Sequence, residues 1–108
     1  MARKVETHTA GEESEAHLQA LRAQIDKLDL QILELLNKRA SIATQIGKVK
    51  LNQGGEVFSA AREEEVLANV LAAHKGPLPE VTIKAIFREL ISGSRAVQKV
   101  TRIAFLGP

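Results

Sequence analysis

Two cationic side chains on one apolar stripe are the first sign of chemistry in this sequence. Arg39 occupies a stripe position where leucine or isoleucine is due. Lys50 follows eleven residues later, which on a helix is about three turns and roughly 16 Å along almost the same face. A lone Arg39 is better explained by structure, as a polar residue that sets register or as a stem that reaches outward. Its pairing with Lys50 favours a site for a small dianion between the two cations.

A third cation, Arg22, adjoins the same stripe seventeen residues before Arg39, about 25 Å away along a helix. It cannot reach the same small ligand within its own chain. In an antiparallel pair of helices, however, the partner's Arg22 lies opposite residues 39 to 50, with the twofold axis near residue 33. The spacing therefore predicts a site shared between two chains.

Polar residues that could complete such a site lie later in the sequence. Ser94 and Gln98 are four residues apart and share one helical face. Ser59 is a candidate N-cap, and Arg62 and Glu63 follow it beside the free N–H groups of a helix start. Each pair alone has a simpler explanation, because polar residues near helix ends are usually exposed and acids at a helix start need no function.

The stripe itself predicts one very long helix, from about Ser14 to Leu51, that ends at Gly54-Gly55. Its apolar stretch from Leu18 to Lys50, taken as about 34 residues, is about 50 Å long, whereas a compact 100-residue domain has a radius of gyration of about 13 Å. One copy of the chain cannot cover such a helix, so we expect a homodimer. The stripe consists of Leu18, Leu21, Ile25, Leu28, Ile32, Leu35, Ile42, Ile46 and Val49.

Two shorter helices follow, so the predicted fold class is all-α: three helices in an intertwined antiparallel homodimer. The second helix is expected to start at Ser59 and end before Gly76-Pro77, and the third to open at Pro79. Gly93 lies inside the third helix, where we expect close packing, because glycine there costs about 1 kcal/mol relative to alanine.

The expected domain division has three parts. Residues 1–16 are polar and without period, and we expect a disordered lead-in. Residues 17–100 form the helical domain. Residues 101–108 break the helical pattern, and the apolar run Ile103–Leu106 is typical of a buried strand at the entrance to a second domain.

Composition excludes several classes of protein. The 108 residues include no cysteine, which argues against disulfides and thiolate metal sites and fits a reducing cytoplasm. The net charge of +2 and three aromatic residues, all Phe, give little for binding nucleic acid. No stretch is long and apolar enough to cross a bilayer, and the N-terminus lacks the apolar run of a signal peptide. No histidine has metal-ligand spacing, so we expect no metal.

Several motifs in order resemble the all-helical chorismate mutase family over roughly residues 18 to 99. They are LRAQIDKLDLQILELLNKRASIATQIGKVK, then AREEEVL, then IFRELISGSRAVQ. The tail RIAFLGP resembles the opening of a prephenate dehydratase domain. The whole therefore resembles the N-terminal mutase domain of a bifunctional chorismate mutase/prephenate dehydratase.

The resemblance implies conversion of chorismate to prephenate in phenylalanine and tyrosine biosynthesis, without a cofactor. It implies that Arg39, Ser94 and the partner's Arg22 bind the substrate carboxylates. Lys50 and Gln98 would donate to the ether oxygen, and Glu63, with Arg62 near it, would accept the ring hydroxyl. Ser59 stands where other members carry Asp, and a backbone N–H there can serve whatever the side chain.

Two alternatives keep the same fold. The domain could be a non-catalytic helical module for dimerisation or ligand sensing that regulates a shikimate-pathway enzyme. The stripe alone fits that hypothesis, but a zipper would fill position 39 with leucine. The second alternative is a mutase domain fused to an enzyme at the start of the aromatic pathway. The RIAFLGP tail argues against this alternative.

Overall fold

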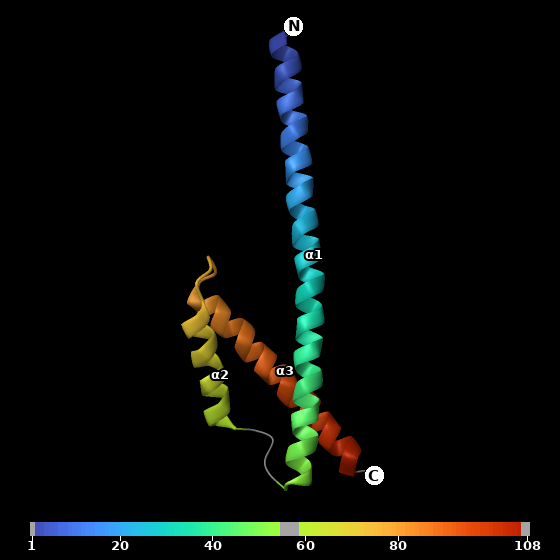
Figure 1. Ribbon diagram of the computed structural model, residues 1–108, viewed down its shortest axis with the longest axis vertical. Helices are drawn as coiled ribbons and strands as arrows, with labels where there is room; N and C mark the ends of the chain where they lie inside the picture. Colours follow the sequence, from blue (N-terminus) through green and yellow to red (C-terminus); the bar gives the residue numbers. More distant parts are fainter. Residues whose placement is uncertain (1, 55–58, 107–108) are drawn as a thin grey trace. The chain divides into compact units, whose positions relative to one another are not determined.

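The computed structural model describes residues 2–54 and 59–106, and every regular element in them is an α-helix. Helix α1 spans Ala2–Asn52, α2 spans Ala60–Ala73 and α3 spans Glu80–Leu106 (Figure 1). The prediction of an all-α chain with three helices, one of them very long, is confirmed. Internal contacts divide the chain into two units, Met1–Leu35 and Leu36–Pro108, and α1 contributes to both.

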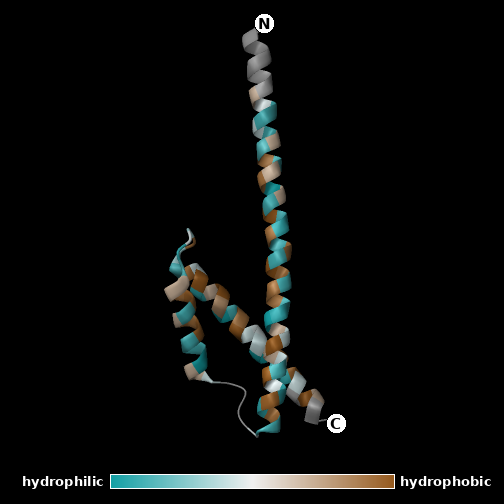
Figure 2. Cartoon of the chain, in the orientation of Figure 1, coloured by the Kyte–Doolittle hydropathy of each residue, from teal (hydrophilic) through white to brown (hydrophobic). Residues whose placement is uncertain are grey.

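In the first unit, the apolar stripe of α1 is exposed. Figure 2 shows hydrophobic positions recurring along this helix between hydrophilic ones. Six large stripe side chains keep between 40 % and 64 % of their surface exposed: Leu18, Leu21, Ile25, Leu28, Ile32 and Leu35. Apolar surface left in water is unfavourable by about 25 cal/mol per Å², so this continuous exposed row is a candidate surface for contact with another protein.

The second unit packs the end of α1 with a hairpin of α2 and α3. Helices α2 and α3 contact each other directly, and each of the three helices contributes to a small core. Ala43 of α1, Leu67 of α2 and Ile91 of α3 are 8 % or 9 % exposed. Gln98 of α3 is a polar side chain buried to the same degree, so the hydrophobic centre of this unit adjoins a polar one.

The helix ends follow the predicted signals. Helix α1 closes in a turn at Gly54, whose φ of 72° suits glycine because no Cβ is present to clash; Gly55 lies outside the described residues. Ser59 is the N-cap of α2, and its hydroxyl accepts the Arg62 backbone N–H at 3.2 Å. The carbonyl of Pro79 accepts the first N–H bonds of α3. The predicted breaker, cap and proline start are therefore confirmed.

The first helix begins earlier than predicted. We expected a disordered lead-in over residues 1–16, but α1 starts at Ala2, so this expectation is wrong for residues 2–16. These residues contain no proline. Extending a helix that already exists adds one hydrogen bond for each residue fixed, and only the nucleus is costly.

The strand predicted at Ile103–Leu106 is also wrong, because α3 continues through Leu106 and Ile103 is exposed. A single strand leaves its backbone N–H and C=O groups unpaired, and the described part of the chain contains no second strand to bond them. A helix satisfies these groups within the segment. A short apolar run is compatible with either a strand or a helix, so its composition did not decide the conformation.

The close packing expected at Gly93 is not found. A Cβ built there meets no atom within 4 Å, whereas one built on Gly47 of α1 would lie 3.3 Å from Cγ of Gln98. Among the described residues, Gly47 is therefore the helix-interior glycine at which a neighbouring side chain approaches closely.

Candidate active site

Arg39 turns toward α3 and does not extend outward into solvent. Its side chain is half-buried, and its Nη1 donates to Oγ of Ser94 at 2.7 Å. The Ser94 hydroxyl donates in turn to the Leu90 carbonyl one helical turn earlier, at 2.9 Å. The two predicted site residues are therefore brought together from positions 55 apart. This arrangement fixes a permanently charged guanidinium at the junction of α1 and α3.

Gln98 donates from its amide nitrogen to the backbone carbonyl of Ala43 on α1, at 2.8 Å. The orientation of the amide is determined because a carbonyl can only accept, so the NH₂ group must face it. The absence of a side chain at Gly47 lets Gln98 come this close to α1. The second N–H of the amide is not used in this bond and can serve a ligand.

Glu63 lies in the first turn of α2 and is bound by an arginine of α3. Arg95 Nε donates to Glu63 Oε2 at 2.7 Å, and Arg95 Nη2 contacts Oε1 of the same carboxylate. The hydrogen bond with Glu63 raises the pKa of Arg95, so this guanidinium remains charged. Arg62, the neighbour of Glu63, pairs instead with Glu65 on the exposed side of α2. The pair of Glu63 and Arg95 thus ties α2 to α3 by a two-point contact.

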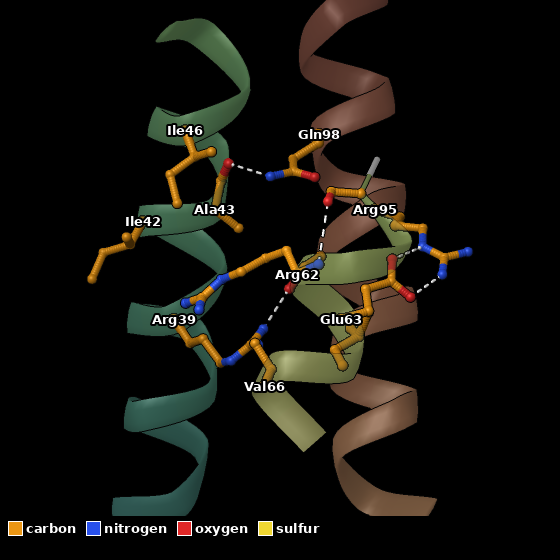
Figure 3. Close-up of a pocket in the computed structure, with 12 residues that line it drawn as sticks. Arg39, Ile42, Ala43, Ile46, Arg62, Glu63, Val66, Arg95 and Gln98 are labelled. Carbon is orange, nitrogen blue, oxygen red and sulfur yellow. Dashed lines mark hydrogen bonds and ion pairs between the residues drawn. The ribbon is translucent and has the colours of Figure 1, made fainter. Parts of the chain in front are cut away.

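These groups surround one cavity of about 260 Å³ in the second unit (Figure 3). Its polar lining comes from all three helices and from the cap of α2, and its apolar lining supplies a hydrophobic wall. The polar residues are Arg39, Ser59, Arg62, Glu63, Ser94, Arg95 and Gln98, and the apolar ones are Ile42, Ala43, Ile46, Val66 and Ile91. Cations, one carboxylate and a buried amide around an apolar wall suit a small, negatively charged organic ligand.

Six of the eight predicted site residues therefore line one cavity, and two do not. Lys50 lies in the last turn of α1 and is exposed. Arg22 is exposed too and belongs to the unit Met1–Leu35. In residues 2–54 and 59–106, no group of three or more His, Cys, Asp or Glu residues could hold a metal ion. None of the helices there is long and apolar enough to span a membrane.

Arg95 is the site residue that the sequence analysis missed. It lies between Ser94 and Gln98 in the motif, yet its partner Glu63 is 32 residues away. The only sequence signal was its charge beside two candidate residues, and charges of that kind are usually solvated. Its contact depends on how α2 packs on α3.

Residues 21–99 match the family described as chorismate mutase type II. The chain belongs to this family. The match covers most of the chain and includes α2, the greater part of α1 and α3 up to Lys99. It also contains all eight predicted site residues, and the resemblance read from the sequence motifs is confirmed.

Relatives and solved structures of chorismate mutases agree with this assignment. The chain is 36 % identical over 95 residues to the bifunctional chorismate mutase/prephenate dehydratase of Aquifex aeolicus, covering 84 % of this chain and 26 % of that one. It is 42 % identical over 87 residues to the enzyme of the same name from Neisseria gonorrhoeae, covering 81 % and 24 %. The chain thus spans about a quarter of the length of these relatives. The form II structure of chorismate mutase from Thermus thermophilus aligns with a TM-score of 0.75 at 34 % identity, covering 77 % of this chain and 94 % of that one.

Proposed function

We propose that this domain is a chorismate mutase, an isomerase that converts chorismate to prephenate in phenylalanine and tyrosine biosynthesis. The observation that carries the proposal is the convergence of Arg39, Ser94, Glu63 and Gln98 on the same cavity, beside an apolar wall. Family membership supports the same reaction.

The proposed reaction is a unimolecular rearrangement in which an ether C–O bond breaks while a C–C bond forms. It transfers no electron to or from the protein and needs no nucleophile, so it requires no cofactor. Catalysis then has two components. The flexible substrate must be held in its compact reactive conformer, and the negative charge that develops on the ether oxygen must be stabilised.

We assign Arg39 to holding the substrate in its reactive conformer. A guanidinium binds a carboxylate through two parallel hydrogen bonds and does not lose its charge near neutral pH. Arg39 is held by Ser94 at 2.7 Å, so its orientation is set before substrate arrives. Ser94 then assists at the same carboxylate.

Gln98 and Lys50 are assigned to the ether oxygen. One N–H of Gln98 bonds Ala43, which leaves the other as a donor fixed in a buried position. Donors that are already oriented stabilise developing charge without reorganising during the reaction. Lys50 would reach this oxygen from the last turn of α1 and add a positive charge.

Glu63 is assigned to the ring hydroxyl, from which it would accept a hydrogen bond. Its side chain is 21 % exposed and lines the cavity. Ser59 caps α2 with its side chain, so its contribution is to place the first turn, where Arg62 and Glu63 lie. Arg62 adds positive potential at this rim.

The homodimer belongs to the same proposal. The exposed stripe of α1 between Leu18 and Leu35 is the surface that a second copy would cover. In an antiparallel pair, Arg22 of the partner subunit would supply the second cation for the dianionic substrate. Each active site would then need both chains.

We also propose that residues 101–108 lead into a prephenate dehydratase-like domain, as in the bifunctional relatives. The absence of cysteine supports a place in the reducing cytoplasm.

The test is incubation of the purified chain with chorismate, following its loss by ultraviolet absorbance and identifying the product. We expect prephenate to form at the rate of chorismate loss. The control is Arg39→Ala, which removes the cation without a new charge. Binding of chorismate without turnover by the folded parent would instead identify the ligand-sensing module.

A further inference from the structure

We propose that Arg95 is a positioning residue of this site: it holds the Glu63 carboxylate in the orientation that receives the substrate's ring hydroxyl. This inference rests on the proposed mutase function and extends it to a residue with no assigned role. Arg95 acts through Glu63 and does not itself contact the substrate.

The geometry of the contact between Arg95 and Glu63 fixes the orientation of the Glu63 carboxylate. Two nitrogens of Arg95 meet the two oxygens of Glu63, with Nε to Oε2 at 2.7 Å. A contact at both oxygens fixes the rotation of the carboxylate plane, which one hydrogen bond would leave free. A carboxylate has about four lone-pair sites. The guanidinium occupies one on each oxygen, so a site remains on each for a hydroxyl donor.

The neighbouring arginine does not perform this task. Arg62 contacts Glu65, and both of these side chains are at least 60 % exposed. Arg95, in contrast, lies on α3 next to Ser94, and both Arg95 and Glu63 line the cavity. The orientation of Glu63 is therefore coupled to the helix that carries Ser94 and Gln98.

Charge gives Arg95 a second role. The substrate carries two carboxylates, so an uncompensated Glu63 would repel it. A guanidinium in contact with Glu63 offsets that charge and leaves its accepting oxygens available. We infer that Arg95 lets one acidic residue serve a site otherwise built for anions.

A purely structural role makes a different prediction. The Arg95 side chain is 49 % exposed, and ion pairs at such positions contribute little to stability. If Arg95 only stabilised the packing of α2 on α3, its loss would lower kcat/KM equally for every substrate. If Arg95 orients Glu63, its loss should lower kcat/KM only for substrates whose hydroxyl donates a hydrogen bond to Glu63.

The experiment compares chorismate with an analogue that carries hydrogen in place of the ring hydroxyl. For Arg95→Met we expect kcat/KM to fall about tenfold with chorismate, as for a lost hydrogen bond to a charged group, and less than twofold with the analogue. Arg95→Lys keeps the charge but not the two-point contact, so its loss with chorismate should be smaller. Lys99→Met is the matched control, an exposed cation of α3 that lines neither this cavity nor the neighbouring pocket beside Glu63 and Arg95; it should behave as the parent with both substrates.

A double-mutant cycle checks the route through Glu63. Adding Arg95→Met to Glu63→Gln should cause little further loss with chorismate. Equal losses with both substrates, or additive losses in the cycle, would overturn the role of Arg95 while leaving the mutase function in place. A folded parent without turnover would overturn the proposed function, and this inference with it.

Discussion

Gln98 shows how strongly a single buried side chain constrains this site. It is 8 % exposed, its amide nitrogen is bound to Ala43, and Gly47 provides the space that it occupies. Its identity as an amide matters because it has two N–H groups and two acceptors to serve. It must donate to a backbone carbonyl, and in the proposed reaction it must also donate to an oxygen that gains negative charge.

Gln98→Glu therefore converts a permanent donor into one that depends on pH. When ionised, the introduced carboxyl presents only acceptors and faces the Ala43 carbonyl, so both kcat/KM and stability should be low at pH 7.5. Burial should raise the pKa of this carboxyl in the folded protein above its ordinary value of about 4.3. This electrostatic loss of stability is then fully present above the raised pKa, shrinks as the pH falls through it, and is gone below the pKa of the unfolded chain.

The measurements for this variant are kcat/KM and the free energy of unfolding against pH. Gln98→Leu is the control, because it lacks the donor at every pH and should show no comparable recovery. A flat profile for Gln98→Glu at parental activity would remove Gln98 from the site.

Arg39→Leu separates function from stability at the cationic position of the apolar stripe of α1. Leucine completes the apolar stripe, and Ser94 keeps its hydrogen bond to Leu90, so no buried group loses its partner. We expect the free energy of unfolding to be unchanged or up to about 1 kcal/mol higher, with kcat/KM reduced about 10²-fold or more. Denaturation at fixed protein concentration and steady-state kinetics measure the two quantities. Lower stability with normal turnover would make Arg39 structural.

At the scale of the elements, two helix-interior glycines provide a matched pair. Alanine at either position gains about 1 kcal/mol of helix propensity, but the surroundings differ. At Gly93 a Cβ meets no atom within 4 Å, and at Gly47 it lies 3.3 Å from Cγ of Gln98. Packing, rather than propensity, should therefore distinguish the two substitutions.

We expect Gly93→Ala to raise the free energy of unfolding by about 0.5–1 kcal/mol without changing kcat. Gly47→Ala should raise the free energy of unfolding by less than this. Its kcat should fall several-fold, because Gln98 must move by a few tenths of an ångström. Thermal denaturation and steady-state kinetics measure both effects. If Gly93→Ala is destabilising, an atom of a second copy packs against that position.

At the scale of the whole molecule, the proposed homodimer predicts complementation between inactive chains. Mix Arg22→Ala with Arg39→Ala under conditions in which subunits exchange. If Arg22 serves the opposite subunit, as proposed, each heterodimer contains one site with both defects and one intact site. We expect activity to recover toward half of the parental value per heterodimer, measured by chorismate loss after exchange is verified by mass spectrometry. No recovery despite exchange would contradict the shared site.

The sequence by itself determined the helices, because the interactions that form them are local. The three-and-four spacing from Leu21 to Leu35, the Ser59 cap and the turn at Gly54 all act within one or two turns. The local signal was weakest where a segment is short: it misassigned Ile103–Leu106, because a short apolar run is compatible with either a strand or a helix. Arg39 was found because it interrupts a periodic pattern.

Only the tertiary structure decided which side chains meet. The bond of Gln98 to Ala43 joins residues 55 apart, and that of Arg95 to Glu63 joins residues 32 apart. Both depend on how α3 packs against α1 and α2, through rotations and offsets that no local pattern records. The same packing gives Gly47 a close neighbour and leaves Gly93 without one, although both are helix-interior glycines in the sequence. Local hydrogen bonds form each helix, but contacts between helices decide what the helices do.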